Sequence, residues 1–223
     1  MTAVLALSGV SRDFVQGDEV VHALTSTDLT VDAGEFVGVI GPSGSGKSTL
    51  LTIMGGLRRP TRGTVTIEGE PFSELPERQR SRVRLRRMGF ILQAASLVPF
   101  LAIADQFALH DHAARAAART AARDDLLDEL GIRSLAGKYP SDLSGGERQR
   151  AAIAVALYHD PQVVLADEPT AALDTHRALD VARILAEQTH GRGKATVMVT
   201  HDERLLGVCD RVLSMEDGTL TQR

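Results

Sequence analysis

The chain has 223 residues, a net charge of −4 at pH 7 and a hydrophobic fraction of 43%. A chain of this length buries most of its apolar surface in a single core, so we expect one main domain. The acidic balance gives no general attraction to nucleic acid, and we predict no nucleic-acid partner. Cys209 is the single cysteine, which excludes an internal disulfide and fits a reducing compartment.

The sequence contains no candidate membrane-spanning segment. No run reaches the roughly 18 apolar residues that a membrane span needs, and no basic leader precedes the first apolar stretch. We therefore expect a cytoplasmic chain that neither spans nor crosses a membrane.

Short apolar runs rich in β-branched residues predict strands, and several of them precede helix-like segments. These runs are Phe36–Ile40, Thr64–Ile67, Gly89–Leu92, Val163–Ala166, Thr196–Thr200 and Val212–Met215. The alternation predicts an α/β fold with a mostly parallel core sheet. We expect antiparallel edge strands on this sheet from the opening run Val4–Val10 and from the closing hairpin that ends in Thr219–Gln222.

Between about residues 75 and 161 the composition is mostly helical, which predicts a helical subdomain. Within it, Ala113–Ala122 consists almost entirely of alanine and arginine. Arg115, Arg119 and Arg123 recur every four residues ahead of an acidic cluster, which indicates charge pairing on a helix surface. The arginines between Arg78 and Arg87 could face anionic lipid or acidic residues of a membrane partner, but a solvated helix face is the favoured interpretation.

A phosphate-binding loop follows the strand predicted at Phe36–Ile40. It fits the pattern G-x-x-x-x-G-K-[ST] and consists of Gly41, Pro42, Ser43, Gly44, Ser45, Gly46, Lys47, Ser48 and Thr49. The loop opens a helix predicted at Thr49–Met54, so backbone N–H groups and the helix N-terminus can bind phosphate oxygens. Lys47 can bridge the β- and γ-phosphates, and Ser48 can ligate Mg²⁺. The strand and helix on either side disfavour the alternative, a flexible glycine-serine turn.

Two adjacent carboxylates end the strand predicted at Val163–Ala166, where open α/β sheets bind their ligands. Asp167 can hold Mg²⁺ through its water shell. Glu168 points the other way on a strand and can accept a proton from the attacking water or orient it. A simple strand-ending turn is the alternative, but beside a phosphate-binding loop the pair predicts hydrolysis.

A second helix N-terminus is predicted at Ser144, which has a glutamate three residues on and an alanine-rich helix, Ala151–Tyr158, behind it. Its free N–H groups form a second anion site, although an ordinary capping box has the same spacing. The run LSGGERQR, residues 143–150, resembles the signature motif of ATP-binding cassette (ABC) proteins. With GPSGSGKST, VVLADEP, Gln93, Asp174 and His201, the resemblance covers essentially the whole chain in the family's order.

The resemblance implies one ABC ATPase domain over residues 1–223, in which about 75–161 form a helical signature subdomain. It implies a head-to-tail dimer in which ATP on the loop of one copy contacts the signature motif of the other, through Ser144, Gly145 and Gly146. It further implies that Phe14 stacks on adenine and that Asp174 belongs to a loop crossing the dimer interface. Gln93 would contact Mg²⁺ and the water region, and His201 would reach the γ-phosphate, so the implied catalytic residues are Glu168, His201 and Gln93.

The resemblance is nearest to the lipoprotein-releasing, macrolide-export and cell-division subgroup. It implies an ATPase subunit on the inner face of the plasma membrane that drives a separate integral-membrane permease. An ABC ATPase that regulates a cell-envelope complex without transport is the alternative. The apolar stretch Ala94–Ala104 is predicted to contact the permease, since Pro99 disfavours a buried core helix there.

Overall fold

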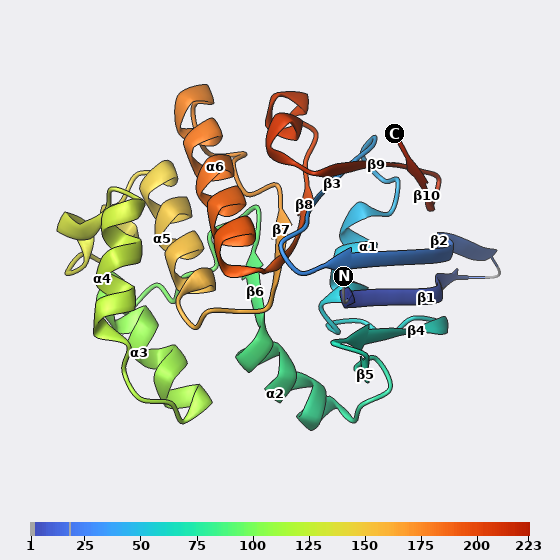
Figure 1. Ribbon diagram of the computed structural model, residues 1–223, viewed down its shortest axis with the longest axis horizontal. Coiled ribbons are helices and arrows are strands. Elements are labelled where there is room, and N and C mark those ends of the chain that lie inside the picture. The colour runs from blue at the N-terminus through green and yellow to red at the C-terminus, as the bar shows by residue number, and fades with distance from the viewer. Residues whose placement is uncertain (1–2, 18) are drawn as a thin grey trace.

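The computed structural model describes residues 3–17 and 19–223, which form two β-sheets with helices packed against them (Figure 1). One sheet is antiparallel and has the strand order β2-β1-β4-β5, with β1 (Ala3–Gln16), β2 (Glu19–Asp32), β4 (Arg62–Ile67) and β5 (Glu70–Pro71). The other sheet has the order β10-β9-β3-β8-β7-β6, with β3 (Phe36–Ile40), β6 (Met88–Ile91), β7 (Val163–Asp167), β8 (Ala195–Val199), β9 (Arg211–Glu216) and β10 (Thr219–Gln222).

The second sheet confirms the predicted mostly parallel core. Its neighbouring strands are parallel except at the edge, where β10 pairs antiparallel with β9 as the predicted closing hairpin. The expectation that Val4–Val10 forms another edge of this sheet is wrong. That run lies in β1, which pairs antiparallel with β2 on one side and with β4 on the other. A long hairpin connects β1 to β2, and this local pairing builds a separate sheet.

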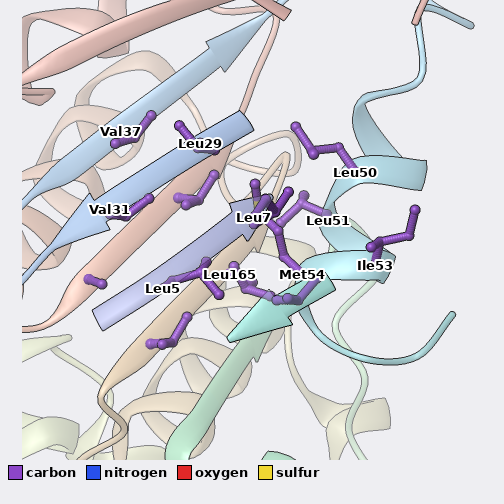
Figure 2. Close-up of a cluster of buried hydrophobic side chains, with 14 of the residues drawn as sticks. Leu5, Leu7, Leu29, Val31, Val37, Leu50, Leu51, Ile53, Met54 and Leu165 are labelled. Carbon is purple, nitrogen blue, oxygen red and sulfur yellow. The ribbon is translucent and has the colours of Figure 1, made fainter. Parts of the chain in front are cut away.

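The main apolar core lies between the antiparallel sheet, the parallel sheet and helix α1 (Lys47–Met54), as Figure 2 shows. Leu5 of β1, Leu50 of α1 and Leu165 of β7 are all fully buried in it. Close packing of this kind leaves side chains few alternative positions. It therefore anchors both ends of the phosphate-binding loop, the strand before it and the helix after it.

A second apolar cluster joins the parallel sheet to the helices α3 (Ile103–Ala114), α4 (Thr120–Glu129), α5 (Gly145–Leu157) and α6 (Thr175–Arg192). Three short 3₁₀ helices lie at Arg133–Leu135, Pro140–Asp142 and Glu203–Val208. Within residues 3–17 and 19–223, none of the helices is both long and apolar enough to cross a membrane. The subdomain boundary at about residues 75–161 stays a prediction; β6 falls inside that range but belongs to the parallel sheet.

The predicted helix over Ala113–Ala122 is wrong. Helix α3 ends at Ala114, Arg115 has the left-handed φ of 53°, and α4 begins only at Thr120. The break separates Arg115 and Arg119 from α4, so within the described residues the predicted charge pairing is found only for Arg123, which pairs with Asp124 at 2.7 Å. The backbone N–H of Arg119 instead donates to the Tyr158 hydroxyl, and its guanidinium donates to the Tyr158 carbonyl. Alanine favours helices, but these tertiary hydrogen bonds hold Arg119 in a non-helical conformation just before α4 begins.

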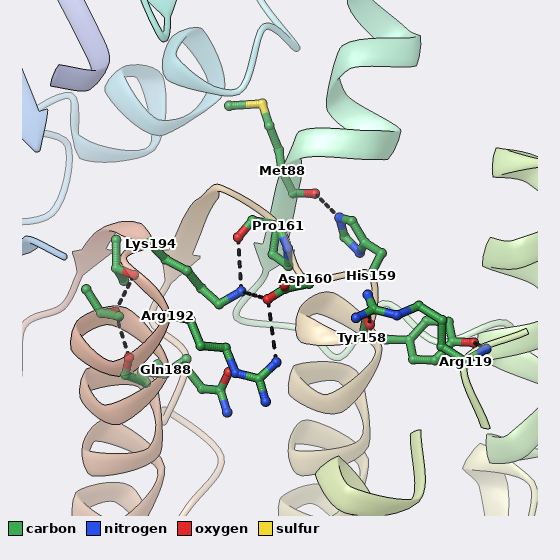
Figure 3. A network of polar contacts seen from close by, with 12 residues as sticks. Met88, Arg119, Tyr158, His159, Asp160, Pro161, Gln188, Arg192 and Lys194 are labelled. Atoms are coloured by element: carbon green, nitrogen blue, oxygen red, sulfur yellow. Dashed lines mark hydrogen bonds and ion pairs between the residues drawn. The ribbon is translucent and has the colours of Figure 1, made fainter. Parts of the chain in front are cut away.

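A buried lysine ties two strands together at their amino-terminal ends (Figure 3). Lys194, which is 2% exposed, precedes β8; its ammonium donates to Asp160 and, at 3.1 Å, to the carbonyl of Pro161 ahead of β7. Arg192 adds an ion pair of 3.5 Å to Asp160. Burial lowers the pKa of Lys194. The network fixes the edge of the sheet opposite the candidate site, so the carboxyl ends of β7 and β8 are held in register.

Candidate active site

A cavity of about 440 Å³ opens at the carboxyl ends of the parallel strands. It is lined by the phosphate-binding loop, the two predicted carboxylates and the residues that follow β6 and β8. The full lining is Ala23, Gly41, Ser43, Gly44, Gly46, Lys47, Ser48, Thr49, Gln93, Asp167, Glu168, Val199 and His201. Most of the residues predicted to hold the phosphates and the metal, and all three predicted catalytic residues, therefore lie together.

Glycine is required in the loop because the backbone packs closely against other strands. A Cβ atom on Gly46 would lie 2.4 Å from the carbonyl oxygen of Ala23, and its φ of 105° disfavours other residues. A Cβ atom on Gly41 would lie 2.1 Å from the carbonyl oxygen of Met215. The loop consequently keeps its N–H groups at the start of α1, where the helix dipole favours an anion.

The side chain of Lys47 is positioned by backbone carbonyl groups of the phosphate-binding loop. Its ammonium donates to the carbonyl oxygens of Gly41 at 2.8 Å and Pro42 at 2.7 Å. These bonds hold a positive charge at the rim of the cavity, next to the helix N-terminus. Pro42 and Ser45 do not line the cavity; the Ser45 hydroxyl is buried inside the loop. The arrangement suits a polyphosphate.

Two oxygen ligands face each other beside the loop. The Ser48 hydroxyl donates to Asp167 Oδ2 at 3.2 Å, and Gln93 lines the same cavity. Burial raises the pKa of Asp167, and the Ser48 hydrogen bond opposes that shift. Hydroxyl, carboxylate and amide oxygens are the hard ligands that Mg²⁺ takes in phosphate sites, so Ser48, Asp167 and Gln93 fit this ion. Bound there, Mg²⁺ would neutralise charge on the phosphate oxygens.

Glu168 is held as a proton acceptor by two side chains that follow β8. The His201 Nδ1 atom lies 2.8 Å from Glu168 Oε1, and the Thr200 hydroxyl donates to Oε2 at 3.4 Å. The Glu168 side chain is 15% exposed, whereas that of His201 is 72% exposed. Because the charged carboxylate is the acceptor, Nδ1 of His201 carries the proton, which leaves Nε2 directed away from Glu168. A carboxylate fixed in this way can orient and deprotonate a water molecule.

The sequence interpretation missed Thr200, Ala23 and Val199 as site residues. Thr200 ends the predicted strand Thr196–Thr200, whereas the observed strand β8 ends one residue earlier, at Val199. Thr200 directly precedes His201, which is the one local signal that could have identified it. Its hydroxyl also accepts the backbone N–H of Asp202 at 3.0 Å and so fixes the turn that carries His201. Ala23 comes from the antiparallel sheet, and no sequence pattern indicates that β2 approaches the loop.

The signature residues do not line the cavity. Ser144 caps α5: its hydroxyl accepts the N–H of Glu147 at 3.3 Å, and the Glu147 carboxylate accepts the N–H of Ser144 at 2.8 Å. This confirms the predicted capping box, and the Ser144 backbone hydrogen bond lowers the pKa of Glu147. Asp174 caps α6 and accepts the N–H of Arg177 at 3.1 Å. A Cβ atom on Gly146 would lie 3.0 Å from Leu173, so the two caps are neighbours outside the cavity.

Phe14 also lies outside the cavity lining. Its ring packs against two guanidinium groups, with Arg12 at 4.7 Å and Arg58 at 5.4 Å from the ring centroid. Both distances are in the range of cation–π contacts. Its stacking on adenine stays a prediction, as do the contacts of Ser144, Gly145, Gly146 and Asp174 with a nucleotide.

A glycine-rich loop between a buried strand and a helix, beside a Ser–Asp oxygen pair and a fixed glutamate, defines a P-loop nucleotide hydrolase. The ABC transporter family matches residues 24–171, and the chain belongs to this family. It is an ABC ATPase, whose substrate is ATP.

Two curated relatives and one solved protein are similar over nearly the whole chain. The macrolide export ATP-binding/permease protein MacB of Agrobacterium fabrum is 42% identical over 97% of this chain, which spans only 34% of that relative. The lipoprotein-releasing system ATP-binding protein LolD of Anaeromyxobacter dehalogenans is 41% identical over 98% of this chain and 93% of its own length. The bacterial ABC transporter cassette MJ0796, solved as a dimer, is 32% identical over 98% of both chains with a TM-score of 0.91. The same cassette solved in a post-hydrolysis state with ADP and Pi has a TM-score of 0.89.

Proposed function

We propose that two copies of this chain form a head-to-tail dimer around two ATP molecules. The dimer acts on the cytoplasmic face of the membrane, where it drives a separate integral-membrane permease. The observation that carries the dimer is the separation of two anion-binding helix N-termini within one copy. The start of α1 lines the cavity, whereas the start of α5 at Ser144 lies outside it. One copy therefore supplies only part of the surface that encloses a triphosphate.

The α5 N-terminus is free to receive a ligand from another molecule. A Cβ atom on Gly145 would meet no atom within 4 Å, so the backbone at the first helical residue is open. The capping box occupies the N–H groups of Ser144 and Glu147 and leaves those of Gly145 and Gly146 for a phosphate oxygen. Docked on the cavity of a second copy, this helix start would complete the phosphate site. The dimeric state of the MJ0796 cassette supports the same arrangement.

The permease contact is supported by the segment that follows Gln93. Phe100 in this segment is 79% exposed. The side chain of Gln106, which is 5% exposed, fixes the segment through hydrogen bonds to the backbone of Val98 and Leu101. Ile103, also predicted to be part of this surface, is instead fully buried in the helical core because it begins α3. A rigid loop that presents an aromatic ring is suited to docking an apolar partner segment. The name of the MacB relative, an ATP-binding/permease protein, also links such a cassette to a permease.

In this proposal, closure of the dimer brings the γ-phosphate of ATP between Lys47 of one copy and the α5 start of the other. Glu168 accepts a proton from the attacking water, while His201 holds its carboxylate and faces the phosphate with Nε2. Hydrolysis and loss of phosphate remove the charge that holds the two copies together, so the dimer reopens. That cycle of closure and opening moves the permease.

Complementation between two inactive variants tests the dimer. Lys47→Ala removes the charge that binds phosphate, and Ser144→Arg blocks the α5 start, so each variant alone should lose ATP hydrolysis. In an equal mixture, half of the dimers are mixed, and each mixed dimer has one intact composite site. About a quarter of the wild-type activity should return. Ser141→Arg, an exposed position just before the cap, is the matched control and should keep activity. A mixture no more active than the separate variants would contradict the head-to-tail geometry.

A further inference from the structure

Helix α2 (Glu77–Arg87) carries six arginines and one glutamate, and the structure divides the arginines into two sets. The inner set is bonded to the protein. Arg80 is 5% exposed and donates from Nε to the Gly56 carbonyl at 2.8 Å, and Arg84 donates to the same oxygen at 2.8 Å. Arg87 pairs with Glu68 at 3.3 Å. The interpretation of the whole run as one solvated face is therefore wrong.

The outer set consists of Arg78, Arg82 and Arg86, which we term the arginine stripe. All three side chains are exposed. Their four-residue spacing places them on one face of the helix along about 12 Å of its axis. None of them forms an ion pair with an acidic side chain in residues 3–17 and 19–223. Three positive charges are thus held in a row by a helix whose inner face is locked in place.

The positive surface continues beyond α2. Arg86 lines a hollow of about 350 Å³ together with Arg115 and Arg119 from the turn between α3 and α4. Asp111 also lines this hollow, but it is 8% exposed and accepts the Tyr158 hydroxyl at 2.7 Å. Helices α2 and α3 lie side by side (Figure 1), joined where His110 Nε2 contacts the Leu85 carbonyl at 3.0 Å. This concentration of arginine stands out on a chain whose net charge is −4.

We propose that the arginine stripe binds the anionic phospholipid headgroups of the membrane surface. Guanidinium groups bind phosphate through paired N–H donors. Arginines without an ion-pair partner are also attracted by the negative surface potential of an anionic bilayer. Single-stranded nucleic acid is the other polyphosphate, but it is bound on aromatic platforms, and α2 has no aromatic residue. A row of like charges along a straight helix can contact several phosphate groups at once on a membrane surface, where such groups are spread across the whole plane. This contact needs no permease and is separate from the proposed transport function.

Vesicle flotation of the purified full chain tests the proposal. The wild type should float with vesicles of phosphatidylcholine and phosphatidylglycerol and should not float with phosphatidylcholine alone. Each arginine at such a surface contributes roughly fivefold to partitioning, so R78Q/R82Q/R86Q should lower the partition coefficient about a hundredfold. R78K/R82K/R86K keeps the charge and should retain most of the binding. Basal ATP hydrolysis should be unchanged in both variants, because the stripe does not line the cavity.

The matched control is R133Q/R183Q/R223Q, which removes the same charge from exposed arginines that each pair with an acidic side chain. It should float like the wild type. If both glutamine triples lose flotation equally, net charge rather than the stripe controls binding, and the proposal fails. It also fails if the wild type does not float with anionic vesicles, or if oligonucleotide competes the protein off the vesicles at equal phosphate concentration. None of these outcomes depends on dimer formation, so they leave the proposed function untouched.

Discussion

Replacing Glu168 with glutamine isolates the catalytic role of one carboxylate. Glutamine keeps the length of the side chain and an oxygen that can accept from His201 Nδ1, which lies 2.8 Å from Oε1 in the native site. It cannot take a proton from water. Loss of a general base typically slows a reaction by about 10² to 10⁴, which corresponds to about 2.7–5.4 kcal/mol in the activation barrier.

The same replacement should leave the fold intact. The Glu168 side chain is 15% exposed, and within residues 3–17 and 19–223 it forms hydrogen bonds to Thr200 and His201, both of which glutamine can keep, so no apolar packing is lost. Its backbone has a φ of 48°, a strained conformation that glutamine would share with glutamate. We therefore expect the free energy of unfolding to change by less than about 0.5 kcal/mol.

Single-turnover hydrolysis of ATP measures the rate, and light scattering with ATP measures dimer formation. With chemistry slowed and binding retained, the Glu168→Gln protein should accumulate as an ATP-bound dimer. Glu187→Gln on the exposed face of α6 makes the same charge change and should behave like the wild type. Turnover of Glu168→Gln within threefold of the wild type would show that another group accepts the proton.

Two further substitutions test packing and coupling. A Cβ atom on Gly38 would lie 2.9 Å from Cys209 Sγ and 3.3 Å from Leu206, so Gly38→Ala should destabilise the chain by about 1–3 kcal/mol in urea unfolding. Adding Cys209→Ala should restore part of that loss, and strict additivity would argue against the contact. Phe100→Asp should uncouple transport while basal ATP hydrolysis continues.

Much of the site could be predicted from sequence because its parts are local. The phosphate-binding loop, from Gly41 to the first turn of α1, needs glycine, lysine and serine at fixed spacing. This requirement does not depend on distant parts of the chain. The capping box at Ser144 is equally local, since Glu147 is three residues away and both reciprocal bonds form. Asp167 and Glu168 could be assigned because an apolar run ends at them.

What could not be predicted depends on contacts between distant residues. The buried residues of β2 are Leu24, Thr27, Leu29 and Val31. Their alternation predicts a strand, but no local sequence feature indicates that β2 belongs to a separate sheet with β1 and β4. The residue before α4, Arg119, is held by hydrogen bonds that it donates to Tyr158, 39 residues away. The arginines of α2 look alike in sequence. The inner set is distinguished by contacts to distant residues, the Gly56 carbonyl for Arg80 and Arg84 and the Glu68 carboxylate for Arg87.

The prediction for Phe100 follows from its position in the fold. Its ring is 79% exposed, so aspartate there removes no core contact, and the purified chain should unfold at the same urea concentration as the wild type. In membranes that contain the permease, a charge in an apolar contact should lower transport per ATP hydrolysed by at least tenfold. Val20→Asp, at a position 54% exposed on the β1–β2 hairpin, is the matched control and should leave coupling unchanged. Cysteine placed at Phe100 in a Cys209→Ser background should also crosslink to the permease. Normal coupling by Phe100→Asp, with no crosslink under any nucleotide condition, would place the permease contact elsewhere on the cassette.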